Sequence, residues 1–519
     1  MTTPIIGNPV QNQPFLPAAV YPTLPLINLT DEEAQIANTL AMRLFEVRPS
    51  LELRGLYYDG LQKMQDLGIS IPPSLAGLRT VMGWPQIGVD ALDERCTVEG
   101  FRYPNATDSD MDLLDIWLSN NMPLESSLAH LDALIYGRCY VIAGPGDDDA
   151  IPLLTCESPL NMMAVWDARL RKVTSALQLY LNTDFTSDMF GREVAALYLP
   201  GRTIHMARES ANGGLTGTWE LVERDNHGFP DPPVGRLANR QRTSNRDGLS
   251  EIAASWMNLT DSACRTLLGM EVGREFHAAP RRYILGASEE NFKRPDGTPM
   301  TAWETYMGKV WGIERDEDGN LPEVGTFAPS DPSVYTKLLD AYRTDMAAAM
   351  GVPPHYLGIH ADGNPASADA IRMTEARLIK RVERKTQAFG EAWQQMLKFA
   401  LMIRDGKLPD DAHRIETDWA DPGTPTPGAT TDALYKQVAG GMVPATSDVV
   451  LKRAGYSALE RARLAVDRKV DAGASVLAEL ATSLQAKEAR ADVTVARDIN
   501  PAAAKATAAN PNPADGNAR

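Results

Sequence analysis

Residues 350–371 read MGVPPHYLGIHADGNPASADAI, and this stretch joins two segments with helical periodicity. The upstream segment begins with Ser-Asp-Pro at 330–332, where a capping side chain precedes a proline near the first helical position. Gly351 suits a left-handed helix cap, and the two prolines at 353–354 cannot continue the helix. The sequence therefore predicts a helix over 331–351.

A second, long helix follows the loop. The Asn-Pro-Ala-Ser sequence at 364–367 supplies a helix start signal. Apolar residues then recur at steps of three, four or seven; they are Ile371, Leu378, Val382, Phe389, Trp393, Met396, Ala400 and Ile403. We expect a loop over 352–366 and a helix over 367–405.

A third helical pattern precedes these two. Apolar residues between Ile252 and Met270 share one face and predict a helix over 248–280 that ends at Pro280. Residues 281–330 are mixed and rich in turn residues, which predicts a compact insertion between two long helices.

The region 31–247 predicts a mixed α+β domain in which helices precede a run of short strands. We expect a first helix from Asp31 that ends at Pro49, a second over 51–67 and a strand over 89–101. Helical spacing returns over 111–140. A hairpin and further strands are expected at 140–143, 151–154, 163–166, 176–181, 195–199, 203–206 and 218–224.

Three stretches resemble a known family in their order and spacing: ALIYGRCY at 133–140, GVPPHYLG at 351–358 and NPASADAI at 364–371. The family is that of the portal proteins of tailed double-stranded DNA phages, in the branch similar to the Gp6-like portal of phage SPP1. The resemblance covers residues 31–484. It implies an α+β portal-like subunit with the following parts: a wing (31–247, with a long wing helix at 367–405 and a return strand and linker at 406–424), stem helices (248–280 and 331–351), a small α/β clip (281–330), a tunnel loop (352–366) and a helical crown (425–484).

The resemblance also implies a function. Such a subunit forms a ring, with twelve copies in this family, at one vertex of the capsid, and the genome passes through it during packaging and ejection. The implied partners are double-stranded DNA, the terminase large subunit, the head–tail adaptor, and the major capsid and scaffolding proteins. The implied location is the virion, after assembly in the host cytoplasm.

The residues themselves leave two other classes open. One is another structural component of the virion, such as an adaptor or capsid protein, and the other is a DNA-processing enzyme. The sequence has no Walker-type phosphate loop, nucleophile elbow or His-Glu-x-x-His motif. We therefore expect no enzymatic activity, no cofactor and no metal, and a separate ATPase for packaging.

Composition limits how DNA is contacted. The 519 residues contain 51 Lys+Arg and 68 Asp+Glu, a net charge of −17, so any attraction to DNA must be local. An acidic channel wall and simple solubility both fit this charge. The four scattered cysteines indicate reduced core residues rather than disulfides or a zinc site.

The loop at 352–366 is the main candidate site, because two capped helices hold its ends. The resemblance implies that it projects into the channel and touches DNA through His355, Tyr356, Gly358, His360, Asp362, Gly363 and Asn364. The alternative is a packed connector between two helices. Two histidines and an aspartate in a loop without supporting ligands do not predict a metal site.

A basic cluster lies on the long helix, with one glutamate among its members: Arg377, Lys380, Arg381, Arg384 and Lys385. It fits a solvated or salt-bridged helix face. It also fits contact with DNA phosphates or with acidic groups on an adjacent subunit. Of these two, we favour the subunit contact, because the apolar stripe of the same helix needs a partner.

Two acidic clusters are expected in turns. Asp147, Asp148 and Asp149 indicate an exposed hairpin turn rather than a magnesium site. In the clip, Glu314, Asp316, Glu317 and Asp318 are predicted to help dock a partner.

The two ends differ from the rest. Residues 1–30 are uncharged and contain six prolines, which fits an extended arm lying on a neighbouring subunit or a disordered end, and neither a signal peptide nor a membrane anchor. Residues 485–519 are rich in Ala, Pro and Asn and predict a disordered tail.

Overall fold

The structure is a computed structural model. It describes residues 28–62, 80–103, 110–146, 151–209, 218–277, 282–285, 293, 296–299, 323–326, 331–359, 368–423, 427–457, 459–470, 478, 482–483 and 485. The chain divides into two compact units, 1–104 with 110–426 and 105–109 with 427–519.

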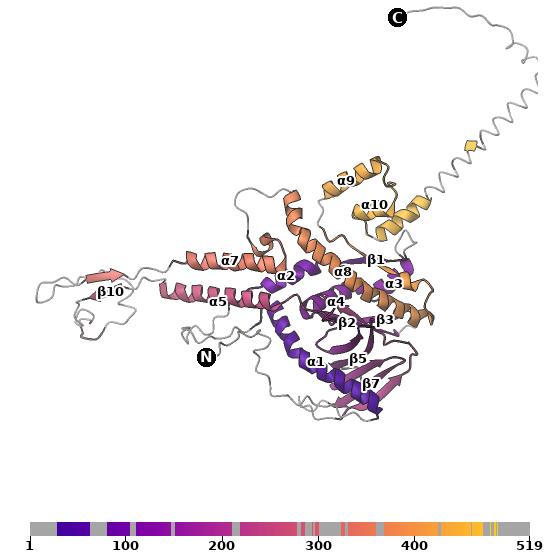
Figure 1. Cartoon of the computed structure of the whole chain (residues 1–519), viewed down its shortest axis with the longest axis horizontal. Coiled ribbons are helices and arrows are strands. Elements are labelled where there is room, and N and C mark those ends of the chain that lie inside the picture. The colour runs from indigo at the N-terminus through magenta and orange to yellow at the C-terminus, as the bar shows by residue number, and fades with distance from the viewer. Residues whose placement is uncertain are drawn as a thin grey trace, which may run out of the picture. The chain divides into compact units, whose positions relative to one another are not determined.

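A five-stranded antiparallel sheet in the order β4-β5-β6-β7-β8 forms one layer of the first unit (Figure 1). Its strands are β4 (Met162–Asp167), β5 (Lys172–Leu181), β6 (Arg192–Leu199), β7 (Arg202–Glu209) and β8 (Glu220–Asp225). Helix α1 (Asp31–Tyr58) covers one face, where Leu40 and Leu44 join Leu197 and Trp219 in a buried cluster. The alternation of apolar residues along the strands thus determines which face α1 occupies.

The other face of this sheet packs on a smaller sheet in the order β3-β2-β9. Its strands are β2 (Arg138–Gly144), β3 (Leu153–Glu157) and β9 (Val234–Ala238). Tyr140 and Val234 of the smaller sheet pack with Ala176 and Tyr198 of the larger one. The Tyr140 hydroxyl also accepts a hydrogen bond from the Ala164 amide, 3.3 Å away.

Helix α8 (Ala368–Asp405) lies at the centre of the largest core. It packs with α2 (Trp84–Asp93), α3 (Met111–Ser119), α4 (Met122–Tyr136) and the antiparallel pair of β1 (Val98–Arg102) and β12 (Glu416–Trp419). Trp393 of α8 meets Trp117 of α3 edge-on, with ring centroids 5.1 Å apart. Phe389 stacks on His130 of α4 at 5.0 Å. A short 3-10 turn, η4 (Ala412–Arg414), connects α8 to β12.

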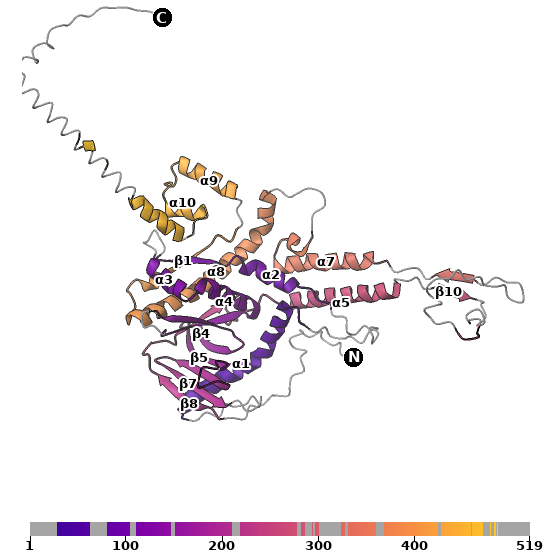
Figure 2. The same ribbon diagram turned by 180° about the vertical axis from the view of Figure 1, so that it is seen from behind.

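Helices α5 (Ala254–His277) and α7 (Ser333–Met350) run side by side (Figures 1 and 2). Near their bases, a Cβ on Gly88 of α2 would lie 2.8 Å from Met350 Sδ and 3.0 Å from Trp256 Cζ3, so α2 approaches both helices closely. Between them in sequence lie β10 (Arg282–Leu285) and β11 (Glu323–Thr326), which pair antiparallel.

The second unit is helical. It contains α9 (Pro427–Ala439), α10 (Asp448–Arg453) and a helical segment at 459–470. Arg461 donates to Asp448 at 2.7 Å and ties this last segment to α10. These helices agree with the helical character expected for residues 425–484.

Most of the long elements expected from the sequence are present. The helices expected over 367–405, 248–280 and 331–351 are confirmed as α8, α5 and α7, and the strands expected between 163 and 224 as β4 to β8. The strand expected at the end of the wing is β12, which returns to pair with β1. The assignment of these elements to wing, stem, clip and crown stays a prediction.

Two local expectations are wrong, one of them in part. Pro49 lies inside α1 instead of ending it, because Leu51 and Tyr57 beyond it are buried and outweigh the lost helical hydrogen bond. Of the strand expected over 89–101, residues 98–101 are confirmed as part of β1, but 89–93 belong to α2, whose Val89 and Leu92 are fully buried. At the start of α7 the N-cap is Pro332, and the side chain of Asp331 before it accepts a hydrogen bond from the Ser333 amide at 2.9 Å, so the expected capping side chain is present.

No helix among the described residues is long and apolar enough to cross a membrane.

Candidate functional site

The start of the predicted tunnel loop is anchored in the core. Helix α7 ends at Gly351, whose φ of 68° is left-handed as expected for a glycine cap. The 3-10 turn η3 (Pro354–Leu357) follows, with Leu357 buried. Of the seven predicted loop residues, the structure describes His355, Tyr356 and Gly358. The other four lie outside the described residues; they are His360, Asp362, Gly363 and Asn364.

Tyr356 joins two charged side chains that come from distant parts of the chain. Arg95, just after α2, donates from Nη2 to the Tyr356 hydroxyl at 2.7 Å. The hydroxyl in turn donates to Glu375 Oε1 at 3.1 Å. Arg95 and Glu375 are themselves 3.5 Å apart, and their side chains are only 9% and 7% exposed. We call Arg95, Tyr356 and Glu375 the clasp.

The clasp connects both sides of the loop. Tyr356 comes before residues 360–367, which the structure does not describe. Glu375 comes after them, near the start of α8. Burial raises the pKa of the Tyr356 phenol, so it stays protonated and able to donate at neutral pH. A buried ion pair that shares a phenol satisfies the polar atoms it joins and holds their geometry.

The basic cluster lies against the end of α7. Arg377 Nη1 donates to the Ala348 carbonyl at 3.4 Å, one of the last carbonyls of that helix. A Cβ on Gly351 would lie 3.1 Å from Arg377 Nε and 3.2 Å from Arg381 Nη1, so the cap leaves room for both side chains. Cations near a helix C-terminus interact favourably with its dipole.

Two members of the cluster bind Glu251, a fully buried carboxylate that precedes α5. Both Arg381 and Lys385 form ion pairs with it, and Lys385 Nζ also donates to Asn239 Oδ1 at 2.6 Å. Burial alone would raise the pKa of Glu251, but the charges of Lys385 and Arg381 outweigh burial and lower it. Burial lowers the pKa of Lys385 despite this partner.

The remaining three cluster residues, Arg377, Lys380 and Arg384, are exposed. Lys380 pairs with Glu383 on its own helix at 2.5 Å. The salt-bridged interpretation of the cluster therefore fits Arg381, Lys385 and Lys380. Contact of any member with DNA or with an adjacent subunit stays a prediction.

Neither acidic turn can be placed. Glu314, Asp316, Glu317 and Asp318 of the expected clip, and the aspartates at 147–149, lie outside the described residues. In the part of the chain that the structure describes, no group of three or more His, Cys, Asp or Glu side chains is arranged to hold a metal ion.

The stretch ALIYGRCY has a packing role that sequence reasoning missed. Gly137 has a φ of 96°, and its carbonyl lies only 2.1 Å from where a Cβ on Gly248 would be. The same carbonyl accepts from the Asn239 amide at 2.9 Å, and Ser250 Oγ donates to the Ile135 carbonyl at 2.5 Å. Because two backbones touch here, glycine is required at both positions. No local signal in the sequence indicated this contact or the role of Arg95.

The chain is similar to known portal proteins. The family model described as "Phage portal protein, SPP1 Gp6-like" matches residues 44–449. The portal protein of Mycobacterium phage D29 is 34% identical over 415 residues, which cover 78% of this chain and 82% of the relative. That of Mycobacterium phage L5 is 32% identical over 448 residues, which cover 84% and 89%.

Solved structures also match, at lower similarity. One chain is from the virion of a native gene transfer agent particle, with a TM-score of 0.44, 17% identity and coverage of 78% of this chain and 93% of that chain. Another is from the neck of an empty particle of the same kind, with a TM-score of 0.43, 16% identity and coverage of 78% and 93%. Since the family model spans most of the chain and both viral relatives exceed 30% identity over most of their length, this chain belongs to the SPP1 Gp6-like family of phage portal proteins.

Proposed function

We propose that this protein is the subunit of a portal ring at one vertex of a phage capsid, where it forms the channel for genome packaging and ejection. The observation that carries the proposal is family membership over residues 44–449. The paired helices α5 and α7 and the β10–β11 pair between them in sequence agree with a stem and a clip.

The exposed surface of the stem pair supports a ring. Helix α7 buries only four residues, and Val334 and Leu338 on it are exposed in the single chain. A head-to-tail interface between identical subunits closes into a ring when its rotation divides the circle, and the family resemblance implies twelve copies. Native mass spectrometry of the purified protein should give a closed oligomer. A monomer at all accessible concentrations would contradict the proposal.

The tunnel loop is the part of the channel that contacts DNA in this proposal, and the clasp is the device that holds its two ends. Replacing residues 360–364 with a longer, bulkier sequence should leave rings intact and impair DNA packaging. The matched control is the same insertion at the exposed turn at 184–190 of the β5–β6 hairpin, which should leave packaging unchanged. Loss of ring assembly in the loop variant would show that the loop is a structural connector.

The exposed basic residues are assigned to the subunit interface. In this proposal Arg377 and Arg384 pair with acidic side chains of an adjacent copy, and both are exposed in the single chain. Arg384→Glu should weaken ring assembly at low salt, with the loss reduced at high salt because ions screen the charges. If the variant assembles normally but packages less DNA, the residue contacts DNA instead.

The other partners follow from the same proposal. The clip, with Glu314, Asp316, Glu317 and Asp318, docks the terminase large subunit during packaging and the head–tail adaptor afterwards, and the wing meets the capsid and scaffolding proteins. Changing these four residues to Asn or Gln should reduce binding of purified terminase and leave the ring unchanged. The protein is then a component of the virion that assembles in the host cytoplasm.

The role is mechanical rather than enzymatic. ATP hydrolysis for packaging belongs to the separate terminase. Incubation of purified rings with duplex DNA, Mg²⁺ and ATP should show no turnover beyond a sample with the tunnel loop replaced. Nuclease or ATPase activity that copurifies with the ring through several columns would support a DNA-processing enzyme instead.

A further inference from the structure

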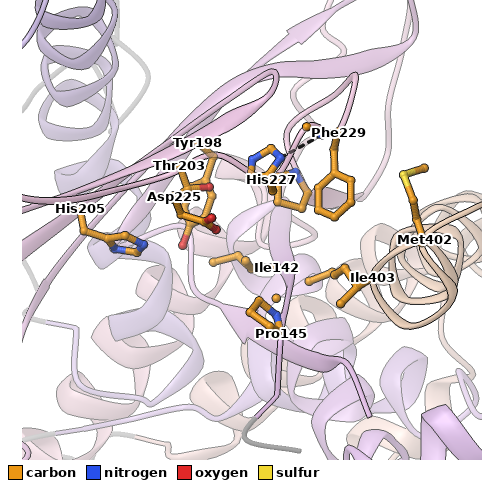
Figure 3. Close-up of a pocket in the computed structure, with 15 residues that line it drawn as sticks. Ile142, Pro145, Tyr198, Thr203, His205, Asp225, His227, Phe229, Met402 and Ile403 are labelled. Carbon is orange, nitrogen blue, oxygen red and sulfur yellow. Dashed lines mark hydrogen bonds between the residues drawn. The ribbon is translucent and has the colours of Figure 1, made fainter. Parts of the chain in front are cut away.

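The joint between the two sheets differs at its two ends. Where β2 finishes, a pocket of about 590 Å³ is lined by apolar, hydroxyl and imidazole side chains and by the carboxylate of Asp225 (Figure 3). Its described lining residues include no lysine or arginine. Towards the start of β2, two arginines face the larger sheet instead, Arg138 of β2 and Arg236 of β9. Positive charge is therefore concentrated away from the pocket.

The pairing of β2 with β9 places both arginines on one face. Tyr140 pairs directly with Arg236, and Arg138 lies two residues before Tyr140 on the same strand. The three side chains thus share the face that packs on the larger sheet. They converge on the edge strand β4. Arg138 Nη2 lies 4.0 Å from Met163 Sδ, and Arg236 Cζ lies 4.3 Å from the centre of the Trp166 ring.

Both arginines are at least nine-tenths buried and only partly paired. Arg138 is 9% exposed, its Nε has no hydrogen-bond partner among the described residues, and the weak contact with Met163 is the one hydrogen bond its side chain makes there. Arg236 is 5% exposed and pairs with Asp247 at 3.2 Å, but its Nε and Nη2 have no partner in the described part of the chain. The Asp247 side chain is 66% exposed, so water weakens this ion pair.

A third arginine approaches from α1. A Cβ on Gly55 would lie 3.1 Å from the Tyr136 hydroxyl, so the turn of α1 that carries Arg54 lies against the residues just before β2. Arg54 Nη1 donates to the Ser50 carbonyl at 3.0 Å, whereas its Nε is buried without a partner among the described residues. Burial, and then the charge of Arg138, lower the pKa of Arg54, so these two cations are close enough to repel each other.

We call Arg54, Arg138 and Arg236 the arginine cluster. Burial lowers the pKa of Arg236 to about 10, and the charge of Arg138 contributes to this. Three positive charges thus face one largely exposed carboxylate, that of Asp247. A buried cation without a counter-charge is strongly destabilising. Water can accept from the remaining N–H groups but supplies no charge. Guanidinium groups, by contrast, bind oxyanions through paired N–H···O hydrogen bonds.

We propose that the arginine cluster binds one small oxyanion of the phosphate or sulfate class, which joins α1 to the two sheets. The ligand is a free ion rather than a phosphate of the DNA backbone, because Arg138 and Arg236 are too deeply buried for a duplex to reach. The proposal concerns each subunit by itself and does not depend on the channel function.

Calorimetric titration of inorganic phosphate into the full-length protein tests it, in chloride buffer of constant ionic strength. We expect one phosphate per chain, with sulfate as a competitor. Arg138→Met and Arg236→Met should each weaken binding about tenfold or more, since a hydrogen bond to a charged group contributes about that much. Arg169→Met is the matched control, because it removes an exposed arginine from the turn between β4 and β5, and it should bind as the wild type does.

Thermal denaturation gives a second readout. At equal ionic strength, phosphate should raise the midpoint of the wild type and of Arg169→Met relative to chloride, and leave that of Arg138→Met unchanged. Without phosphate, Arg138→Met should be at least as stable as the wild type, because it removes a buried charge that lacks a partner. The wild-type titration needs no variant, so it decides the question even where a variant fails to fold.

Three results would overturn the proposal. One is a wild type that neither binds phosphate nor is stabilised by it, because water or another part of the chain would then satisfy the cluster. Another is unchanged binding in Arg138→Met and Arg236→Met, or an equal loss in Arg169→Met, because phosphate would then bind elsewhere on the surface. The third is binding to monomers that disappears in assembled protein, because an acidic side chain of an adjacent copy would then fill the site.

Discussion

Helix α8 and the α5–α7 pair differ in how far their apolar side chains are buried within the chain. Phe389, Trp393 and Met396 of α8 are fully buried within the chain. On α7, by contrast, Val334 is 63% exposed and Leu338 is 40% exposed. The side chains of α5 are described as far as residue 274. Leu268 is the last of them that is buried.

We infer that the region around α8 folds on contacts within one chain, whereas α5 and α7 are the part that neighbouring subunits would cover in the proposed ring. Around α8, apolar burial and paired charges are both completed by the same chain. Among the described residues, α5 and α7 contact each other along their length and contact α2 and η3 near their bases. In the proposed ring, the remaining surface of α5 and α7 would lie between subunits, so we expect the stability of the region around α8 and the stability of the assembly to respond to different substitutions.

Trp393→Ala should cause the largest loss. It removes a fully buried indole that meets Trp117 edge-on and donates to His130 Nε2 at 2.9 Å. A cavity of this kind costs about 5 kcal/mol of unfolding free energy. Chemical denaturation followed by circular dichroism measures it, with Val334→Ala on α7 as the control at about 0.5 kcal/mol or less. Similar losses of unfolding free energy for the two variants would show that α8 and α7 do not differ in how much they stabilise the single chain.

Glu251→Gln tests the point where the two regions meet, because Glu251 precedes α5 and binds α8. Removing the carboxylate leaves Lys385 buried without its counter-charge, which costs about 3 kcal/mol. Glu251→Leu combined with Lys385→Met should recover part of this loss, because the buried Lys385 charge is then removed, although Arg381 still loses its partner. Additive effects of the two changes in denaturant titrations would show that the pair is not coupled.

The stability of the region around α8 should also depend on pH, because His130 packs against this helix. Burial lowers the pKa of His130 from 6.5 to about 3. The folded state then holds the neutral ring while the unfolded chain binds a proton, so stability is complete above pH 6.5 and falls as the pH drops towards 3. At pH 4.5 the loss from this residue is about 2–3 kcal/mol.

His130→Gln keeps an acceptor for Trp393 and removes the titration. The difference in unfolding free energy between wild type and variant should shift in favour of the variant by that amount between pH 8 and pH 4.5. Denaturant titrations at the two pH values measure it. A constant difference would mean that another group accounts for the acid sensitivity of this core.

The long elements were predictable because their signals repeat. Helix α8 carries an apolar stripe over many turns, and strands β4 to β6 contribute buried residues to the clusters on both faces of their sheet. Pro49 and the first part of the segment 89–101 were misjudged because the deciding information is tertiary. Burial of Leu51 and Tyr57 sustains α1 past its proline, and burial of Val89 and Leu92 selects a helix where the local pattern also fits a strand.

For each contact in the candidate site, the sequence indicated one of the two residues and not its partner. The sequence indicated Tyr356 in the loop and the basic residues of α8, but their partners are far away in the chain. Arg95 is 261 positions from Tyr356, and Glu251 is 134 positions from Lys385. Helical spacing reports neighbours on the same helix, so it cannot identify a carboxylate supplied by another element.

Val334→Ser combined with Leu338→Ser should have the smallest effect on the isolated subunit and a clear effect on the ring. Both side chains are exposed, so the unfolding free energy of the monomer should change by about 0.5 kcal/mol or less. Loss of apolar surface between subunits should nevertheless lower the fraction of closed rings in native mass spectrometry. Leu170→Ser, at an exposed turn between β4 and β5, is the control and should assemble normally. If the double variant assembles as well as this control, the exposed face of α7 does not lie between subunits, and the stem pair is complete within one chain.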